Sequence, residues 1–144
     1  AIMLDCDHFK HINDTYGHTV GDQVLRKLSE IALNTIRKAD ILGRYGGDEF
    51  MILLPETGPE AALKAAERLR FDVNSTPFAT NAGNLHFSIS VGVSSLDLDV
   101  HNLGELLDRA DYASYVSKDS GGNRVTIWSP YLARRGWRPN QDPR

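Results

Sequence analysis

The stretch ILGRYGGDEFMILLP, residues 41–55, decides the fold because it places a glycine pair and two acids between two short apolar runs. Each apolar run has the length and composition of a β-strand. Gly46 and Gly47 favour a tight turn between them, since glycine readily adopts the positive φ angles of many hairpin turns. The pattern therefore predicts a β-hairpin that carries Asp48 and Glu49 at its tip.

A second acidic pair follows the apolar run at the start of the chain. Residues 1–4 are Ala-Ile-Met-Leu, and Asp5 and Asp7 come shortly after them. We expect this run to be a buried strand that delivers both acids at its carboxyl end. If the strand neighbours the hairpin, these acids meet Asp48 and Glu49 and offer hard oxygen ligands to Mg²⁺. For either pair alone, the competing interpretation is a solvated loop that gathers acids.

The rest of the chain alternates between helical and strand patterns. Apolar residues recur every three or four positions in some segments and every second position in others, most strictly over residues 85–93. The predicted helices are 23–36 with Asp22 as N-cap, 59–71 and 103–118; the predicted strands are 85–93 and 124–128, with a loop over 76–84. This order predicts an α/β (α+β) fold, a mixed central sheet covered by helices.

Composition limits the kind of protein this is. The chain has 144 residues, 41% hydrophobic and 24% charged, typical of one globular domain. We expect that domain at residues 1–128 and a flexible tail at 129–144. A single cysteine excludes an intrachain disulfide, and no apolar run has the length of a membrane span, so we expect a cytoplasmic setting.

Several other site classes are not supported by the motifs. The formal net charge is −3, and the last fourteen residues hold four Arg and one Asp, so the body is acidic and a poor partner for nucleic acid. Neither a P-loop nor a G-x-G-x-x-G fingerprint occurs, and the acids at the chain start lack the EF-hand spacing. His8 and His11 have no accompanying zinc motif, so we expect surface or supporting roles for them.

Six blocks of the chain match a known family at that family's spacing. They are DCDHFKHINDTYGH at 5–18, GD at 21–22, RYGGDEF at 44–50, SISVGV at 88–93, ADYASYVSK at 110–118 and GNRV at 122–125. Over residues 1–128 the chain resembles a GGDEF-family diguanylate cyclase domain. The resemblance implies a fold like the palm of nucleotidyl cyclases and polymerases. It also implies an enzyme that condenses two GTP into cyclic di-GMP and two pyrophosphates, each protomer of a homodimer presenting one GTP.

The resemblance assigns metal binding and catalysis to the two acidic segments. It implies that Asp5, the backbone carbonyl of Cys6, Asp48 and Glu49 hold Mg²⁺, with Mn²⁺ as a possible substitute. Asp48 and Glu49 are also the implied catalytic residues. The general base stays open between Glu49 and a metal-bound hydroxyl.

The implied substrate contacts divide into base and phosphate contacts. Asn13 and Asp22 read the guanine edge, where Asp accepts from N1–H and N2–H₂ and Asn donates to O6. The implied phosphate contacts are Gly46, Gly47, Lys10 and Lys118. One departure concerns position 122, which is often basic in the family and is Gly122 here; Arg124 is the candidate that compensates.

The resemblance also implies product inhibition. Arg37 and Asp40 fit the family's Arg-x-x-Asp inhibitory motif upstream of the turn, and Arg68 is a third candidate contact for cyclic di-GMP. The competing interpretation of Arg37 and Asp40 is a surface ion pair at a helix end. The amino-terminal helix with the family's Leu-Thr-x-Leu-x-Asn-Arg segment is absent from this chain.

Two other functions compete with an active cyclase. The first is a catalytically silent domain that binds GTP or cyclic di-GMP and signals through a partner; the intact acidic turn argues against it. The second is a palm-type transferase acting on nucleic acid, which the acidic body and the lack of a basic, aromatic-lined strand path disfavour.

Overall fold

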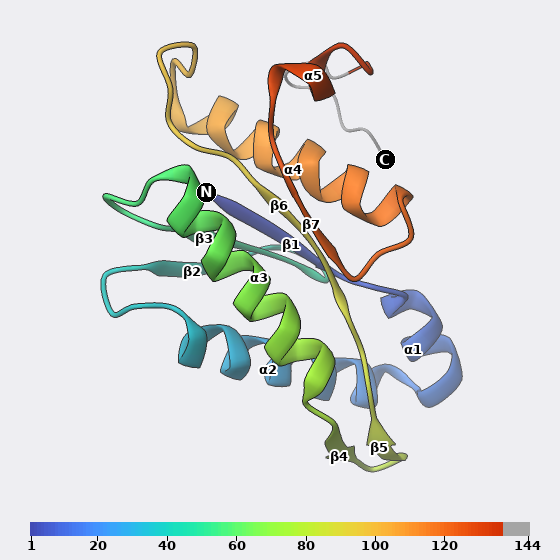
Figure 1. Ribbon diagram of the computed structural model, residues 1–144. Helices are drawn as coiled ribbons and strands as arrows, with labels where there is room; N and C mark the ends of the chain where they lie inside the picture. Colours follow the sequence, from blue (N-terminus) through green and yellow to red (C-terminus); the bar gives the residue numbers. More distant parts are fainter. Residues whose placement is uncertain (137–144) are drawn as a thin grey trace.

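The structure is a computed structural model that describes residues 1–136, and strands and helices alternate along it (Figure 1). The strands are β1 (Ile2–Cys6), β2 (Ile41–Gly46), β3 (Glu49–Leu53), β4 (Phe78–Thr80), β5 (Gly83–Leu85), β6 (Ile89–Val93) and β7 (Arg124–Ile127). The helices are α1 (Phe9–Tyr16), α2 (His18–Thr35), α3 (Pro59–Ser75), α4 (Leu103–Asp119) and α5 (Pro130–Ala133).

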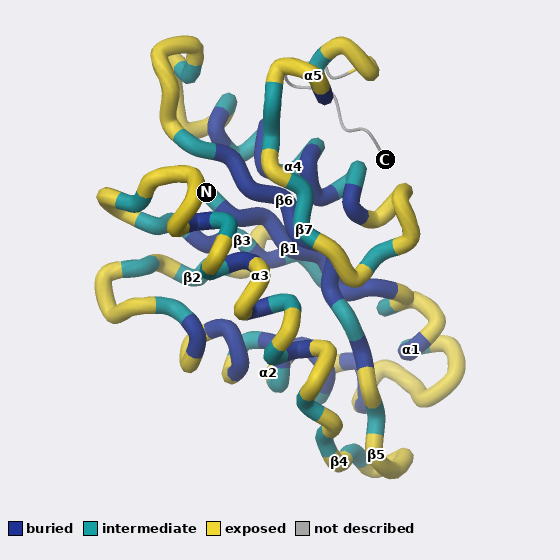
Figure 2. The backbone as a smooth tube through the Cα atoms, viewed as in Figure 1, coloured by how far each residue is buried: buried dark blue, intermediate teal, exposed yellow. Residues whose placement is uncertain are grey.

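Five strands form one mixed sheet in the order β2-β3-β1-β6-β7. β1 lies at its centre, antiparallel to β3 and β6, whereas β6 and β7 run parallel. Every residue of β1 is buried, which explains why its apolar run is continuous rather than alternating (Figure 2). β2 and β3 form the hairpin predicted from the glycine–acid segment.

Helices cover both faces of this sheet (Figure 1). Side chains alternate between the two faces along a strand. On β6, Ile89, Val91 and Val93 join the core cluster with apolar residues of α2 and α3. Ser94 points to the other face, where its Oγ donates a hydrogen bond to the carbonyl of Leu106 on α4 at 2.6 Å. α4 therefore packs opposite α2 and α3.

The contact between α4 and β6 is close because small residues line it. A Cβ on Gly92 would lie 2.2 Å from the backbone nitrogen of Ser114, so only glycine fits there without a shift of α4. Ser117 Oγ donates to the carbonyl of Val91 at 2.8 Å. These contacts hold α4, and with it Lys118, against the centre of the sheet.

The mixed sheet covered by helices was predicted correctly, but one predicted helix needs correction and one helix was missed. α2 begins at His18, so Asp22 lies inside the helix and is not its N-cap. α1 was not predicted, because only Ile12 of its eight residues is buried and so short a helix gives little periodicity. Gly17, with φ of 89°, separates α1 from α2.

The segment before the best-defined predicted strand also differs. The expected loop over 76–84 contains β4 and most of β5, which form a two-stranded hairpin with Gly83 at φ of 101°. The strand expected over 85–93 begins only at Ile89. Ile89 pairs with Cys6, the last residue of β1, so residues before it have no neighbouring strand at the sheet centre.

The turn of the first hairpin closes in a different way from the one predicted. Neither Gly46 nor Gly47 has a φ in the left-handed region. Instead the register shifts between Arg44 and Gly46, and Gly46 then pairs with Glu49. The chain reverses at Gly47 and Asp48, between the paired Gly46 and Glu49, without the predicted positive φ angles.

The expected tail is described only as far as residue 136, and the remainder of 129–144 lies outside the described residues. Within the described part, α5 forms and its Leu132 is buried. Nowhere in residues 1–136 is there a helix long and apolar enough to cross a membrane.

Candidate active site

The end of β1 and the tip of the β2–β3 hairpin meet at one place. Asp5 and Glu49 are directly opposed in the antiparallel register. The backbone N–H of Cys6 donates to the carbonyl of Asp48 at 3.3 Å, which holds the turn beside the strand. The predicted meeting of the acidic segments is thus observed for Asp5, Asp48 and Glu49.

Asp5 sits in an environment that disfavours its charged form. Its side chain is buried, and burial raises its pKa to about 7, with the nearby Asp48 carboxylate adding to the rise. Lys118 Nζ lies 3.1 Å from Asp5 Oδ2 and acts in the opposite direction. Within residues 1–136, carboxylates therefore gather beside the ammonium group of Lys118, an arrangement that a divalent cation would relieve.

The donor set suits a hard cation but is not a complete cage. Within residues 1–136, no three His, Cys, Asp or Glu groups have the geometry to hold a metal by themselves. Mg²⁺ normally takes one or two carboxylates and completes its shell with substrate phosphates and water. The oxygens around Asp5 fit that mode of binding. His8 and His11 are exposed, as expected for surface roles.

Asp7 does not join this cluster, contrary to the expectation that both acids of the chain start contribute oxygen ligands. Its carboxylate accepts hydrogen bonds from Ser88 Oγ and Ser90 Oγ, both at 2.6 Å. The backbone N–H of Asn123 donates a third, at 2.8 Å. Sequence reasoning missed these partners because they lie far from Asp7 along the chain.

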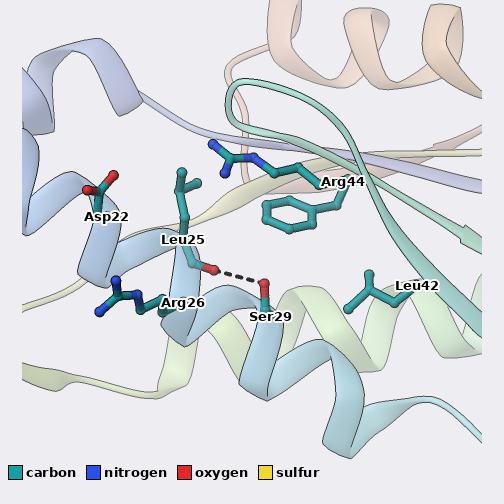
Figure 3. Close-up of a pocket in the computed structure, with 7 residues that line it drawn as sticks. Asp22, Leu25, Arg26, Ser29, Leu42 and Arg44 are labelled. Carbon is teal, nitrogen blue, oxygen red and sulfur yellow. Dashed lines mark hydrogen bonds between the residues drawn. The ribbon is translucent and has the colours of Figure 1, made fainter.

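A cavity of about 460 Å³ lies between α2 and the hairpin (Figure 3). Asp22 and Arg26 project from α2 on one side, and Arg44 extends from β2 on the other. Asn13 is not among the lining residues. Its Oδ1 is buried without a hydrogen-bond partner among the described residues, and it lies where a Cβ on Gly21 would be.

Arg44 braces the hairpin turn. Its Nε and Nη2 donate to the carbonyl of Gly47 at 3.0 and 2.5 Å, and Nε is 3.4 Å from the carbonyl of Gly46. A Cβ on Gly47 would meet nothing within 4 Å, so the turn presents open space to a ligand. Sequence reasoning did not assign a role to Arg44. Its position two residues before the glycine pair could have indicated that its side chain reaches the turn.

The remaining phosphate candidates are spread more widely. Lys10 is exposed on α1, and its side chain makes no hydrogen bond to another residue of the described part of the chain. Arg124 is exposed at the start of β7, and its Nε donates to the carbonyl of Gly122 at 3.3 Å. Of the cationic candidates, only Lys118 contacts the acidic cluster within the described residues.

The three candidate product contacts line a separate cavity of about 340 Å³. Arg37 and Asp40 form an ion pair at 3.3 Å, as the surface ion-pair interpretation requires, yet both face this cavity. Arg37 also donates to Thr57, and Arg68 donates to the carbonyl of Thr35. The cavity adjoins the Ile41 end of the hairpin, one strand length from the Gly46–Asp48 turn.

Comparison with known proteins agrees with this geometry. The family described as "Diguanylate cyclase, GGDEF domain" matches residues 1–124. The chain is 43% identical to diguanylate cyclase A of Treponema denticola, over 88% of the chain and 34% of that protein. It is 42% identical to the response regulator PleD of Caulobacter vibrioides, over 87% of the chain and 28% of that protein. The chain thus spans about a third of these relatives.

Solved structures give the same result. The active GGEEF domain of a diguanylate cyclase from Vibrio cholerae superimposes with a TM-score of 0.83 at 38% identity, covering 89% of this chain and 81% of that one. The GGDEF domain of DgcB from Caulobacter crescentus, solved in complex with c-di-GMP, gives a TM-score of 0.81 at 32% identity, covering 88% and 75%. On its sequence, its sheet topology and its acidic turn, the chain belongs to the diguanylate cyclase GGDEF-domain family.

Proposed function

We propose that this chain is the catalytic domain of a diguanylate cyclase, which condenses two GTP into cyclic di-GMP and two pyrophosphates. The observation that carries the proposal is the opposition of Asp5 and Glu49 beside Asp48, where carboxylates gather next to the open Gly47 turn. The names of the relatives from Treponema denticola and Vibrio cholerae support the same activity. The proposal includes the cytoplasmic setting expected from the single cysteine.

Asp5, Asp48, Glu49 and the carbonyl of Cys6 would hold Mg²⁺, and Mn²⁺ suits the same oxygen donors. When bound, the metal neutralises phosphate charge and activates the attacking 3′-hydroxyl. Glu49 and Asp48 orient the reacting groups from the hairpin tip. Lys118, already 3.1 Å from Asp5, would move its charge to the phosphates when a cation occupies the carboxylates.

Recognition of guanine falls to Asp22 and Asn13 in this proposal. The exposed carboxylate of Asp22 lines the cavity between α2 and the hairpin, where it can accept from the guanine N1–H and N2–H₂. Asn13, whose carboxamide oxygen is buried without a partner among the described residues, would donate from its NH₂ group to guanine O6. Adenine presents the opposite pattern of donors and acceptors and would leave Asp22 unpaired.

The triphosphate would lie along the turn. Gly46 and Gly47 leave the backbone accessible there, while Lys10, Lys118 and, at the far side, Arg124 supply positive charge. Since the described part of the chain forms one such site and the reaction needs two GTP, we propose a homodimer in which each protomer presents one GTP to the other.

The second cavity is the proposed site of product inhibition. Arg37, Asp40 and Arg68 face it together, and guanidinium groups pair well with phosphate while Asp40 can accept from a guanine edge. The complex of the similar DgcB domain with c-di-GMP supports binding of this ligand by the family. A ligand in this cavity would restrict the motion of the hairpin at its Ile41 end, and so of the turn at its other end.

The proposal is tested by incubating the purified chain with GTP and Mg²⁺ and separating the nucleotides by chromatography. We expect cyclic di-GMP and pyrophosphate, with a rate per protomer that rises with chain concentration until the dimer is saturated. Binding of GTP or cyclic di-GMP without turnover would contradict the proposal and favour a silent signalling domain. A specific activity independent of concentration across the monomer–dimer range would contradict the two-protomer arrangement.

A further inference from the structure

Asp7 has a buried carboxylate that the proposed reaction does not use directly. Only 5% of the residue is exposed. Its Oδ1 accepts from Ser90 Oγ, and its Oδ2 accepts from both Ser88 Oγ and the backbone N–H of Asn123. Both carboxylate oxygens are therefore held by hydrogen bonds from the protein.

These donors belong to two separate parts of the fold. Ser88 lies just before β6 and Ser90 is its second residue, and β6 pairs with β1 in the sheet. Asn123 lies in the turn between α4 and β7 and has a φ of 48°, which non-glycine residues rarely adopt. Asp7 thus joins the sheet to a strained point of that turn.

Gly122 gives an independent sign that the turn is built around Asp7. A Cβ at this position would lie 2.9 Å from Asp7 Oδ2, and the residue has a φ of 74°. Both the close approach to Asp7 and the positive φ favour glycine at this position. The close approach brings the N–H of Asn123 within reach of the carboxylate.

The same turn continues directly from Lys118. The N–H of Gly121 donates to the carbonyl of Lys118 at 3.1 Å, and that of Gly122 donates to the carbonyl of Ser117 at 3.0 Å. Lys118 Nζ in turn lies 3.1 Å from Asp5 Oδ2. A chain of contacts therefore runs from Asp7, just after β1, through the turn to Lys118 and back to Asp5 on β1.

We infer that Asp7 is a positioning residue which, by tying the turn at 121–123 to the end of β1, sets Lys118 against the site formed by Asp5 and the Cys6 carbonyl. This inference rests on the proposed cyclase function. Asp7 acts through Lys118, whose ammonium group must meet a phosphate at a defined place. A misplacement of about 1 Å lowers a rate on the order of 10²-fold.

The first test is Asp7→Asn, which keeps the size of the side chain but turns one acceptor oxygen into a donor. We expect kcat to fall on the order of 10²-fold, while the Mg²⁺ concentration for half-maximal rate stays as in the wild type. Asp119→Asn, an exposed acid at the end of α4, is the matched control and should keep both values. A greatly increased Mg²⁺ requirement, or an unchanged kcat, would overturn the inference.

A second test approaches the same contact from the turn. Gly122→Ala should lower kcat in the wild-type background. Its effect should be much smaller in the Asp7→Asn background, because both substitutions disrupt the same contact between Asp7 and the turn. Additive losses would overturn the inference. If Asp7→Asn does not fold, Ser88→Ala takes its place in both tests; it removes one donor and should lower kcat in the same direction by a smaller factor.

A third measurement does not depend on turnover. Amide hydrogen exchange at Asn123 should be slow in the wild type and faster in Asp7→Asn or Ser88→Ala, whereas exchange in the Asp119→Asn control should match the wild type. If the wild type makes no cyclic di-GMP, the proposed function fails, and hydrogen exchange at Asn123 still tests whether Asp7 holds the turn. Faster exchange at Asn123 then supports the tie between Asp7 and the turn, and unchanged exchange overturns it.

Discussion

Asp5 and Glu49 are register partners across the β1–β3 strand pair, so the end of the central strand and the tip of the hairpin meet at one point of the sheet. Asp48 joins them through the hydrogen bond that its carbonyl accepts from Cys6. The site is therefore held by backbone pairing and does not depend on flexible loops. This pairing gathers the carboxylates of Asp5, Asp48 and Glu49, and their negative charge favours binding of a divalent cation.

The first prediction concerns Asp5→Asn and metal binding. Mg²⁺ should raise the melting temperature of the wild type by a few degrees and that of Asp5→Asn much less, because the variant lacks one ligand and has less negative charge to relieve. Thermal melts with Mg²⁺ or with EDTA measure this. Asp14→Asn, an exposed acid on α1, should respond like the wild type. An equal response of Asp5→Asn would contradict the assignment of Asp5 as a ligand.

The raised pKa of Asp5 makes a second prediction for the metal-free protein. Its pKa is about 7 in the fold against 3.8 for the free group, so the folded state holds a proton that the unfolded state has released. The stabilisation from this carboxyl is complete below about pH 4 and is lost as the pH rises through 7. In EDTA, the melting temperature of the wild type relative to Asp5→Asn should fall between these pH values; a constant difference would contradict it.

Selectivity for guanine is predicted to depend on Asp22. Asp22→Ala leaves two donors of the base without an acceptor and should weaken GTP binding by about 1–3 kcal/mol. The affinity for ATP should change little, so the ratio of GTP affinity to ATP affinity should be smaller in Asp22→Ala than in the wild type. Titration of both nucleotides measures it, with Asp14→Ala as the control acid. An undiminished preference for GTP would remove Asp22 from this role.

Much of the site was predictable from the sequence because it depends on strand neighbours. The apolar run followed by acids and the hairpin with acids at its tip predicted that Asp5 meets Asp48 and Glu49 if the two strands are neighbours, and the structure supplies that pairing. The direction of Asp7 was not predictable, since its partners Ser88, Ser90 and Asn123 come from distant segments. The helix α1 and the bulge before Gly46 were also missed, because a short exposed helix gives little periodicity and a bulge depends on the pairing of both strands.

Arg44 is predicted to be essential for the shape of the turn. Arg44→Ala removes the donors to the carbonyls of Gly46 and Gly47, and a turn displaced by about 1 Å should lower the rate on the order of 10²-fold. Arg44→Lys keeps the charge but not the planar pair of donors, so it should recover only part of the rate. Full activity of Arg44→Lys would indicate that the charge, and not the brace, is what matters.

Product inhibition is predicted to depend on Arg37 and not on its neighbour. Arg37→Ala should abolish inhibition by added cyclic di-GMP and leave the initial rate nearly intact, because the cavity lies a strand length from the turn. Lys38→Ala, an exposed cation outside the cavity lining, should remain inhibited. Progress curves and calorimetry with cyclic di-GMP distinguish the two. If Arg37→Ala still binds cyclic di-GMP and its progress curve still reaches an early plateau, Arg37 has no part in inhibition. Arg37 and Asp40 are then only a surface ion pair.

The most direct measurement compares cyclic di-GMP formation from GTP and Mg²⁺ by the wild type and by Glu49→Gln at equal concentration and equal folded fraction. Glu49→Gln keeps the shape of the side chain opposite Asp5 but removes its charge. The account predicts steady synthesis by the wild type and a loss on the order of 10²-fold or more in the variant. Synthesis by Glu49→Gln at the wild-type rate, or none by the folded wild type, would contradict it.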